Sequence, residues 1–362
     1  MSDLFAALDE SSKNFWMTVE LFMRPIFDYL NFAHFIVAVI GVFSTLFHIL
    51  VLTRPSMRAL TINNFLLGIG ICDLIGMISM IFRGCTMLYT NYESSVLLNC
   101  NPPSSYIFMI AMKYIQCITK VTERLAIWYA VAMAVLRCLF IKLPINKKVM
   151  PKNFRIYGLV HSKNGIRLLI SVTAAILPSG VTTYFEVTLK ETNNIWTPPP
   201  NCHNFPSNFS QIEYAIETTN FYNTLQLVEG IFFKIIPSII LQTATIFLVM
   251  KLKKTKILVN QKVRSTTDRD RSTKLVNFMS ISFLIAILPH GILYIIDAYL
   301  NHILGFSILI VRFATIFQFI NTINATVHLL LCYFMSSQYR RTVRSIIRKN
   351  NTSVCTIEHL LK

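Results

Sequence analysis

The chain has 362 residues, of which 54 % are hydrophobic and only 14 % are charged, and its mean hydropathy is +0.53. Soluble domains usually carry about 25 % charged residues, so this composition argues against an ordinary soluble enzyme and for an integral membrane protein. The apolar content excludes disorder over most of the length. The formal net charge of +17 does not indicate nucleic-acid binding, because the basic residues lie between apolar segments.

Seven segments are long and apolar enough to cross a bilayer as helices, which takes roughly 20 residues each. In chain order they are Leu30–Leu52, Ile62–Ile81, Phe108–Ile141, Gly165–Phe185, Leu225–Met250, Leu275–Leu300 and Phe306–Phe334. The third segment carries four charges in its first half, so it must lie inside a bundle rather than face lipid. The predicted fold is therefore an all-α membrane protein, a seven-transmembrane helix bundle.

The distribution of Lys and Arg predicts the orientation of this bundle. Most of the 34 basic residues lie in Thr53–Thr61, Lys142–Asn164, Lys251–Lys274 and the tail after Met335. The positive-inside rule places these segments in the cytoplasm and the amino terminus outside. We thus expect an extracellular segment over residues 1–29, a transmembrane domain over 30–334 and a cytoplasmic tail over 335–362. Within the tail, Ser337–Ile347 has the pattern of an amphipathic helix on the inner leaflet.

Two features of the predicted extracellular loops indicate covalent modification. Cys100 and Cys202 both lie on the oxidising side, so a disulfide between them is expected, with Cys85 as the alternative partner. This bond would tether the long loop Glu186–Thr224 over the extracellular mouth. In the same loop Asn208 begins a glycosylation sequon on the correct side of the membrane.

Ionisable residues within predicted spans indicate a structural or functional role, because burying a charge in the bilayer costs a few kcal/mol or more of free energy. Asp73 lies midway along the second span. It is either a hydrogen-bond hub that holds helices together or a cation or water site that shifts between two packings. Asn324 and His328, four residues apart on the seventh span, are placed to face it. Pro289 interrupts the sixth span and is a candidate hinge.

The charges of the third span follow helical spacing. Lys113, Lys120 and Arg124 lie on one face, with Glu123 beside them. These cations either form ion pairs inside the bundle, with Glu123 or Glu229 as partner, or line a pocket for a ligand that bears negative charge. Further cavity-side candidates, chosen by their depth, are Glu229, Phe233, His290, Tyr294 and Gln318.

The sequence lacks the usual signatures of an enzyme. It has no P-loop, no GxGxxG after a strand, no HExxH and no CxxC pair. The seventh span has no lysine for a retinal Schiff base. We therefore expect no enzymatic activity, no cofactor and no metal site.

Seven spans with an external amino terminus resemble the rhodopsin-like G-protein-coupled receptors. Arg137 ends the third span and Pro144 follows it by seven residues, as in the Asp-Arg-Tyr motif and its downstream proline. The acid before the arginine is replaced by Leu136. Asp73 matches the second-helix aspartate of that family, and Asn324 matches the asparagine of its Asn-Pro-x-x-Tyr motif, whereas His328 stands where the tyrosine would be.

A narrower resemblance is carried by two sequence blocks. They are residues 51–58 (VLTRPSMR) and 335–340 (MSSQYR), supported by His48, Trp128 and residues 70–73 (GICD). Together they resemble the nematode serpentine receptor class W chemoreceptors, a group related to FMRFamide-type peptide receptors, over about residues 41–344.

The resemblance implies a receptor in the cell membrane of sensory neurons that transmits a chemosensory or neuropeptide signal to a heterotrimeric G protein. The sixth helix would move around Pro289, and Arg137 with the basic loop Lys251–Lys274 would meet the G protein. Arg137 has a second interpretation, as a cation that snorkels to the interface. The missing acid implies raised basal activity. The alternatives are a seven-helix ligand-gated ion channel, whose amino terminus would lie inside, and a transporter, which would show two related halves.

Overall fold

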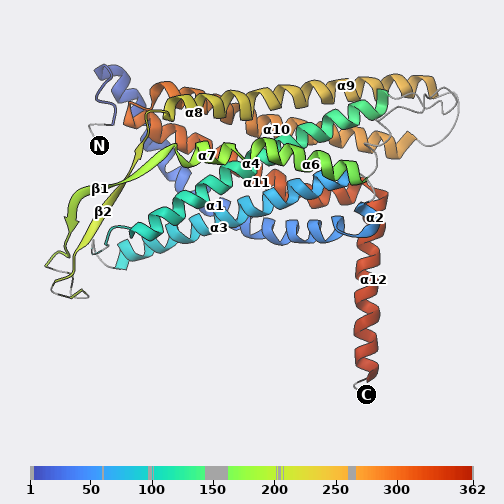
Figure 1. Ribbon diagram of the computed structural model, residues 1–362, viewed down its shortest axis with the longest axis horizontal. Helices are drawn as coiled ribbons and strands as arrows, with labels where there is room; N and C mark the ends of the chain where they lie inside the picture. The colour runs from blue at the N-terminus through green and yellow to red at the C-terminus, as the bar shows by residue number, and fades with distance from the viewer. Residues whose placement is uncertain are drawn as a thin grey trace.

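The computed structural model describes residues 4–58, 61–96, 100, 102–142, 162–200, 202, 205, 206, 208–259 and 266–360. Long helices run beside one another along the longest axis (Figure 1). In chain order the elements are α1 (Glu10–Leu52), α2 (Pro55–Arg58), α3 (Thr61–Val96), α4 (Tyr106–Lys142), α6 (Ser162–Ile176), α7 (Ser179–Tyr184), β1 (Val187–Trp196), β2 (Gln211–Thr218), α8 (Tyr222–Val228), the π-helix η1 (Glu229–Ile235), α9 (Ile236–Val259), α10 (Thr266–Leu300), α11 (Leu304–Met335) and α12 (Ser337–Leu360).

These helices make the predicted seven-helix bundle. The spans are α1, α3, α4, α6 with α7, α8 with η1 and α9, α10, and α11. Within the described residues, six helical segments are long and apolar enough to cross a membrane by length and composition. The one remaining span of the predicted seven is the third, α4, whose charged residues reduce its apolar character. Its apolar residues Val121, Leu125 and Tyr129 are buried against Phe65 and Ile69 of α3, so α4 is a central helix of the bundle.

The first span begins well before the predicted Leu30. Asp9 caps α1 by accepting a hydrogen bond from the Ser12 amide at 3.1 Å, and hydrogen bonds from Ser12 hold the pKa of this carboxyl below its ordinary value. Residues 10–29 are therefore helical and continuous with the first span, although Pro25 lies among them. The amphipathic character of this segment, rather than a continuous apolar run, allows it to extend the helix.

Helix α1 is attached to α11 at several levels along its length. Near the amino terminus, Arg312 forms an ion pair with Glu20 at 2.6 Å, and Phe5 packs against the α10–α11 turn. Deeper in the bundle, His34 lies 2.8 Å from the Thr322 hydroxyl. Below that, the Ser44 hydroxyl donates to the Thr326 carbonyl at 2.9 Å. Helices α1 and α11 thus form one packed pair.

Three prolines shape the spans in different ways. Pro178 separates α6 from α7, which divides the fourth span in two. Pro237 is the second residue of α9 and lies two residues after the end of η1. A proline lacks the amide proton that an α-helix needs, and a π-type turn before it accommodates this loss. Pro289 lies inside α10, which continues through it.

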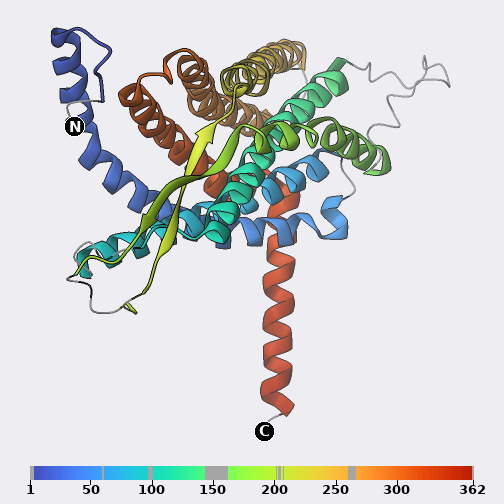
Figure 2. The ribbon, with the colours of Figure 1, turned by 60° about the vertical axis from the view of Figure 1, so that its left-hand side comes forward.

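The loop after the fourth span contains a β-hairpin, which is not among the elements predicted from the sequence. Strands β1 and β2 are antiparallel, with Val187 opposite Thr218 and Trp196 opposite Gln211. The register shifts between Glu191 and Ile195, and within this irregularity Asn193 adopts a φ of 57°. The hairpin lies at the end of the bundle where α1 begins, which is the predicted extracellular end (Figures 1 and 2).

A disulfide joins Cys100, just before α4, to Cys202 in the hairpin loop, with a Cα–Cα distance of 5.7 Å. The predicted pairing is therefore confirmed, and Cys85 is a free, exposed thiol. The bond closes a loop of 102 residues and holds the hairpin at the extracellular end of α4.

We expect Cys100→Ser and Cys202→Ser to reduce surface expression equally and strongly. Removing a native disulfide costs about 2–5 kcal/mol of stability, and the effect grows with loop length. Cys85→Ser is the matched control and should leave expression unchanged. Staining of an external tag on intact cells measures the effect. Unequal losses for the two variants, or a loss for Cys85→Ser, would contradict the pairing.

Helix α12 leaves the bundle at a wide angle (Figures 1 and 2), as expected for a helix along the inner membrane surface. It extends further than the predicted Ser337–Ile347. Tyr339 anchors the side of α12 that faces the bundle. Its side chain is fully buried, and its hydroxyl lies 2.9 Å from the Nδ1 of His48. Burial raises the pKa of Tyr339 above its ordinary value. Val343 and Ile346 continue this face against the end of α1.

Candidate functional site

Buried ion pairs connect α4 to its neighbours in the half of the bundle next to the hairpin, which is the predicted extracellular half. The innermost of them joins Arg124 to Glu229, the first residue of η1, at 2.5 Å. Both side chains are almost fully buried, with 5 % and 3 % of their surface exposed. Arg124 also donates to the carbonyl and the hydroxyl of Ser179, each at 2.8 Å, at the start of α7. The guanidinium therefore ties three spans together.

A second ion pair lies under the base of the hairpin. The Lys120 ammonium donates to both carboxylate oxygens of Glu186, at 2.7 and 2.8 Å. Glu186 directly precedes β1 and also accepts from the Gln226 amide at 2.8 Å. The carboxylate thus fixes the hairpin base to both α4 and α8.

A third ion pair joins Glu123 on α4 to Lys234 on η1. Lys234 is fully buried, and His290 on α10 lies 3.8 Å from the same carboxylate. The π-helical geometry of η1 explains why both of its ionisable residues are buried. Its wider turn places Glu229 and Lys234, five residues apart, on the same side.

Aromatic rings surround these charges. His290 stacks on Tyr294, with ring centroids 5.1 Å apart. The Tyr294 ring also lies within 6 Å of the ammonium groups of Lys120 and Lys234. Phe233 lies 4.6 Å from the Arg124 guanidinium. These rings pack against the ion pairs, so the network lies largely inside the bundle rather than on its surface.

The structure brings together most of the predicted pocket residues. Lys120, Arg124, Glu229, Phe233, His290 and Tyr294 belong to this network. Lys113 lies apart, with its ammonium 3.9 Å from the Tyr184 ring, and Gln318 lines the central cavity that adjoins the network at Glu123. The sequence reading overlooked Lys234 and Glu186. Lys234 could have been found, because it is an ionisable residue within an apolar span.

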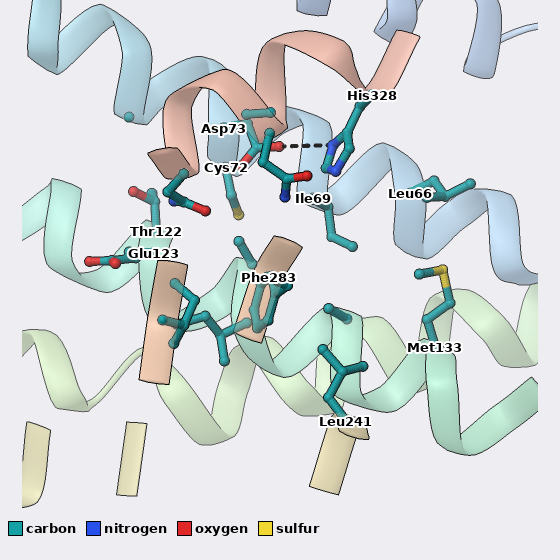
Figure 3. Close-up of a pocket in the computed structure, with 18 of the residues that line it drawn as sticks. Leu66, Ile69, Cys72, Asp73, Thr122, Glu123, Met133, Leu241, Phe283 and His328 are labelled. Atoms are coloured by element: carbon teal, nitrogen blue, oxygen red, sulfur yellow. Dashed lines mark ion pairs between the residues drawn. The ribbon is translucent and has the colours of Figure 1, made fainter. Parts of the chain in front are cut away.

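A central cavity of about 340 Å³ extends from this network toward the cytoplasmic end of the bundle. Glu123 and Thr122 line its upper part, and Arg137 and Ser336 line its lower part. Apolar side chains such as Phe283 form much of the wall between them (Figure 3). The cavity therefore reaches from the level of the ion pairs to residues at the predicted cytoplasmic end of the bundle.

Asp73 and His328 meet across this cavity. The Nδ1 of His328 lies 3.4 Å from an Asp73 carboxylate oxygen, which joins α3 to α11 (Figure 3). Asn324 lines the same cavity, where its side-chain oxygen accepts from the Ser282 hydroxyl of α10 at 3.0 Å. This arrangement links α3, α10 and α11 through polar side chains at the cavity wall.

Arg137 projects into the lower end of the cavity, and no acidic side chain among the described residues pairs with it. Pro144 lies outside the described residues, as does much of the basic segment after it. Asn208 is exposed in the hairpin loop, where a glycan has room. In the described part of the chain no cluster of three potential metal ligands occurs.

The comparisons with known proteins agree with this architecture. The family model described as serpentine type 7TM GPCR chemoreceptor Srw matches residues 32–350, which is most of the chain. The comparison with curated proteins returned no match. The family match places the protein in a membrane that it crosses several times, and it does not favour the channel or transporter alternatives. The chain therefore belongs to the Srw family of serpentine seven-transmembrane chemoreceptors.

Proposed function

We propose that this chemoreceptor transmits the binding of an extracellular ligand to a heterotrimeric G protein, by conformational change alone and without enzymatic activity. The observation that carries the proposal is the central cavity, which extends from Glu123 in the ionic network to Arg137 at the cytoplasmic end. Space between helices permits a second packing of the bundle, and a receptor needs two packings of similar free energy. Both a small chemosensory molecule and a neuropeptide fit this mechanism.

The ionic network is the element that a ligand would bias. Glu123 contacts Lys234 on η1 and His290 on α10, so a change in its partners acts on both segments. His290 directly follows Pro289, where α10 lacks a backbone hydrogen bond and bends most easily. A ligand that favours one pairing shifts the population of that packing. The coupling free energy between the two sites is typically about 1–3 kcal/mol and acts in both directions.

Arg137 is the residue that we propose to contact the G protein. In related rhodopsin-like receptors an acid precedes this arginine, whereas here Leu136 does. Without that acid the guanidinium stays available at the mouth of the cavity, which favours measurable basal activity. Asp73, Asn324 and His328 would change partners as the helices move, with Pro144 and the basic loop completing the G-protein surface.

The test uses this basal activity, so it needs no known ligand. Membranes with the full-length receptor are combined with purified heterotrimeric G proteins of several classes, and nucleotide exchange is measured. We expect exchange above that of receptor-free membranes, and Arg137→Ala should reduce the excess by about tenfold or more, the effect of losing one charge-assisted contact.

Arg344→Ala, on the exposed side of α12, is the control and should retain activity. All variants are compared at equal surface expression. Normal exchange by Arg137→Ala would contradict the assigned role and favour the snorkelling interpretation. Absence of exchange with every G-protein class would contradict the proposed function itself.

A further inference from the structure

Not every cation near this network is neutralised by an acidic side chain of the described residues. The described network contains three ion pairs, in which Lys120, Arg124 and Lys234 are each neutralised by one carboxylate. Arg83 on α3 and Lys113 on α4 form no ion pair with any residue whose side chain the structure describes.

Arg83 and Lys113 line the same cavity. It has a volume of about 160 Å³ and lies between α3, α4 and the hairpin. Among the described residues Arg83 donates a hydrogen bond to the weakly accepting sulfur of Met80, at 4.0 Å, and the Lys113 ammonium lies over the Tyr184 ring. Neither contact supplies negative charge, so both cations are available to a ligand.

The acids nearest to this cavity in the chain are already occupied. Glu186, next to Val187 of the cavity wall, binds Lys120 and Gln226. Glu217, opposite Thr188 on the hairpin, forms an ion pair with Lys190 at 2.5 Å. No acidic residue contributes to the cavity lining that the structure describes. The positive charges of Arg83 and Lys113 are therefore not balanced by an acidic side chain in the described lining of this cavity.

The remaining lining indicates the shape of a matching ligand. Gln116 adds an amide beside the two cations, whereas Met112, Leu189 and Ile216 are apolar. A planar guanidinium and an ammonium bind the oxygens of a carboxylate, sulfonate or phosphate group through charge-assisted hydrogen bonds. The apolar side chains provide a surface for a short hydrocarbon body.

We propose that Arg83 and Lys113 form a binding subsite for an organic anion, an oxygen-bearing acid with a short apolar body that enters beneath the hairpin. The inference rests on the proposed function and names its ligand class. The sequence reading assigned negative charge to a ligand of Lys113, Lys120 and Arg124 together. The structure separates Lys113 from the other two, which are internally paired, and adds Arg83.

The experiment measures ligand binding by the purified full-length receptor in non-ionic detergent at fixed ionic strength. The readout is the midpoint of thermal unfolding as a function of probe concentration, because a ligand that binds only the folded state raises this midpoint. The probes are hexanoate and hexanesulfonate, with the neutral hexanamide as the matched control. At least one anion should raise the midpoint in a saturable way, and hexanamide should not. The stronger of the two anions identifies the preferred acid group.

Variants locate the binding. Arg83→Gln and Lys113→Gln should each weaken the apparent affinity for the anion by about tenfold to a hundredfold, the range for one charge-assisted hydrogen bond. Arg83→Lys should retain most of the affinity. Lys190→Gln on the outer face of the hairpin and Arg344→Gln on α12 remove the same charge elsewhere and should change nothing.

Three results would overturn the proposal: no shift with either anion, an equal shift with hexanamide, or an equal loss in the control variants. The comparison of hexanoate with hexanamide needs only the native chain, so it stands even where a variant fails to fold. The assay contains no G protein. A receptor that drives nucleotide exchange without binding anions contradicts this inference alone, and one that binds anions without exchange contradicts the proposed function.

Discussion

Arg124→Ala is expected to reduce surface expression severely and to lower the unfolding midpoint of any receptor that is recovered. The substitution leaves the buried Glu229 carboxylate without its cation, and breaking one partner of a buried ion pair costs about 3–5 kcal/mol. It also removes the bonds to Ser179 that tie α4 to α7. Surface staining and thermal unfolding in detergent measure the two effects.

The same argument predicts recovery in a double variant. Arg124→Met with Glu229→Leu removes both charges and keeps apolar volume, so it should be more stable than either single change. Lys190→Ala is the control, because it breaks an exposed ion pair of the hairpin and should cost at most about 1 kcal/mol. Equal stability of Arg124→Ala and the native receptor would show that the network does not hold the spans together.

Gly230→Ala should also disrupt the bundle, through packing rather than charge. A Cβ atom at this position would lie 2.6 Å from the carbonyl oxygen of Gly291, where η1 packs against α10. That oxygen belongs to the backbone and cannot rotate away. We expect a loss of about 1–3 kcal/mol or more, the usual cost of overpacking, measured as a lower unfolding midpoint.

Gly76→Ala is the matched control for this substitution. It lies inside α3, and a Cβ atom there meets nothing within 4 Å. Because alanine is a better helix former than glycine by up to about 1 kcal/mol, this variant should be neutral or more stable. If both variants behave alike, the contact between η1 and α10 is not as close as the structure indicates.

The spans and the disulfide could be predicted because they follow from composition and compartment. Long apolar segments locate helices such as α11, and two cysteines on the oxidising side allow few pairings. The hairpin was missed because its strands are largely exposed and far less apolar than the spans, although Val187, Ile195 and Ile212 favour strand structure. In a membrane protein, the long apolar segments dominate the hydropathy pattern, and a short strand-forming pattern in a loop is easily overlooked beside them.

The candidate site was only partly predictable, for a different reason. Helical spacing correctly placed Lys120 and Arg124 on one inward face of α4. It could not show that Lys234 faces Glu123, because this depends on the π-helical turn of η1, which changes the phase of the fifth span. Nor could it show that Lys120 is neutralised, because its partner Glu186 is far away in the sequence. For the same reason it could not show that Arg83 and Lys113 line one cavity.

The attachment of α1 to α11 has a mechanical consequence. Helix α1 has 43 residues and is therefore about 65 Å long, roughly twice the thickness of the hydrocarbon core. Contacts at Glu20, His34 and Ser44 fasten it to α11, and His48 fastens it to α12. Two helices that are joined at several points along their length do not slide or tilt independently of each other. We therefore expect α1 and α11 to move as one unit in the proposed change of packing, with the relative displacement carried by other helices that line the cavity.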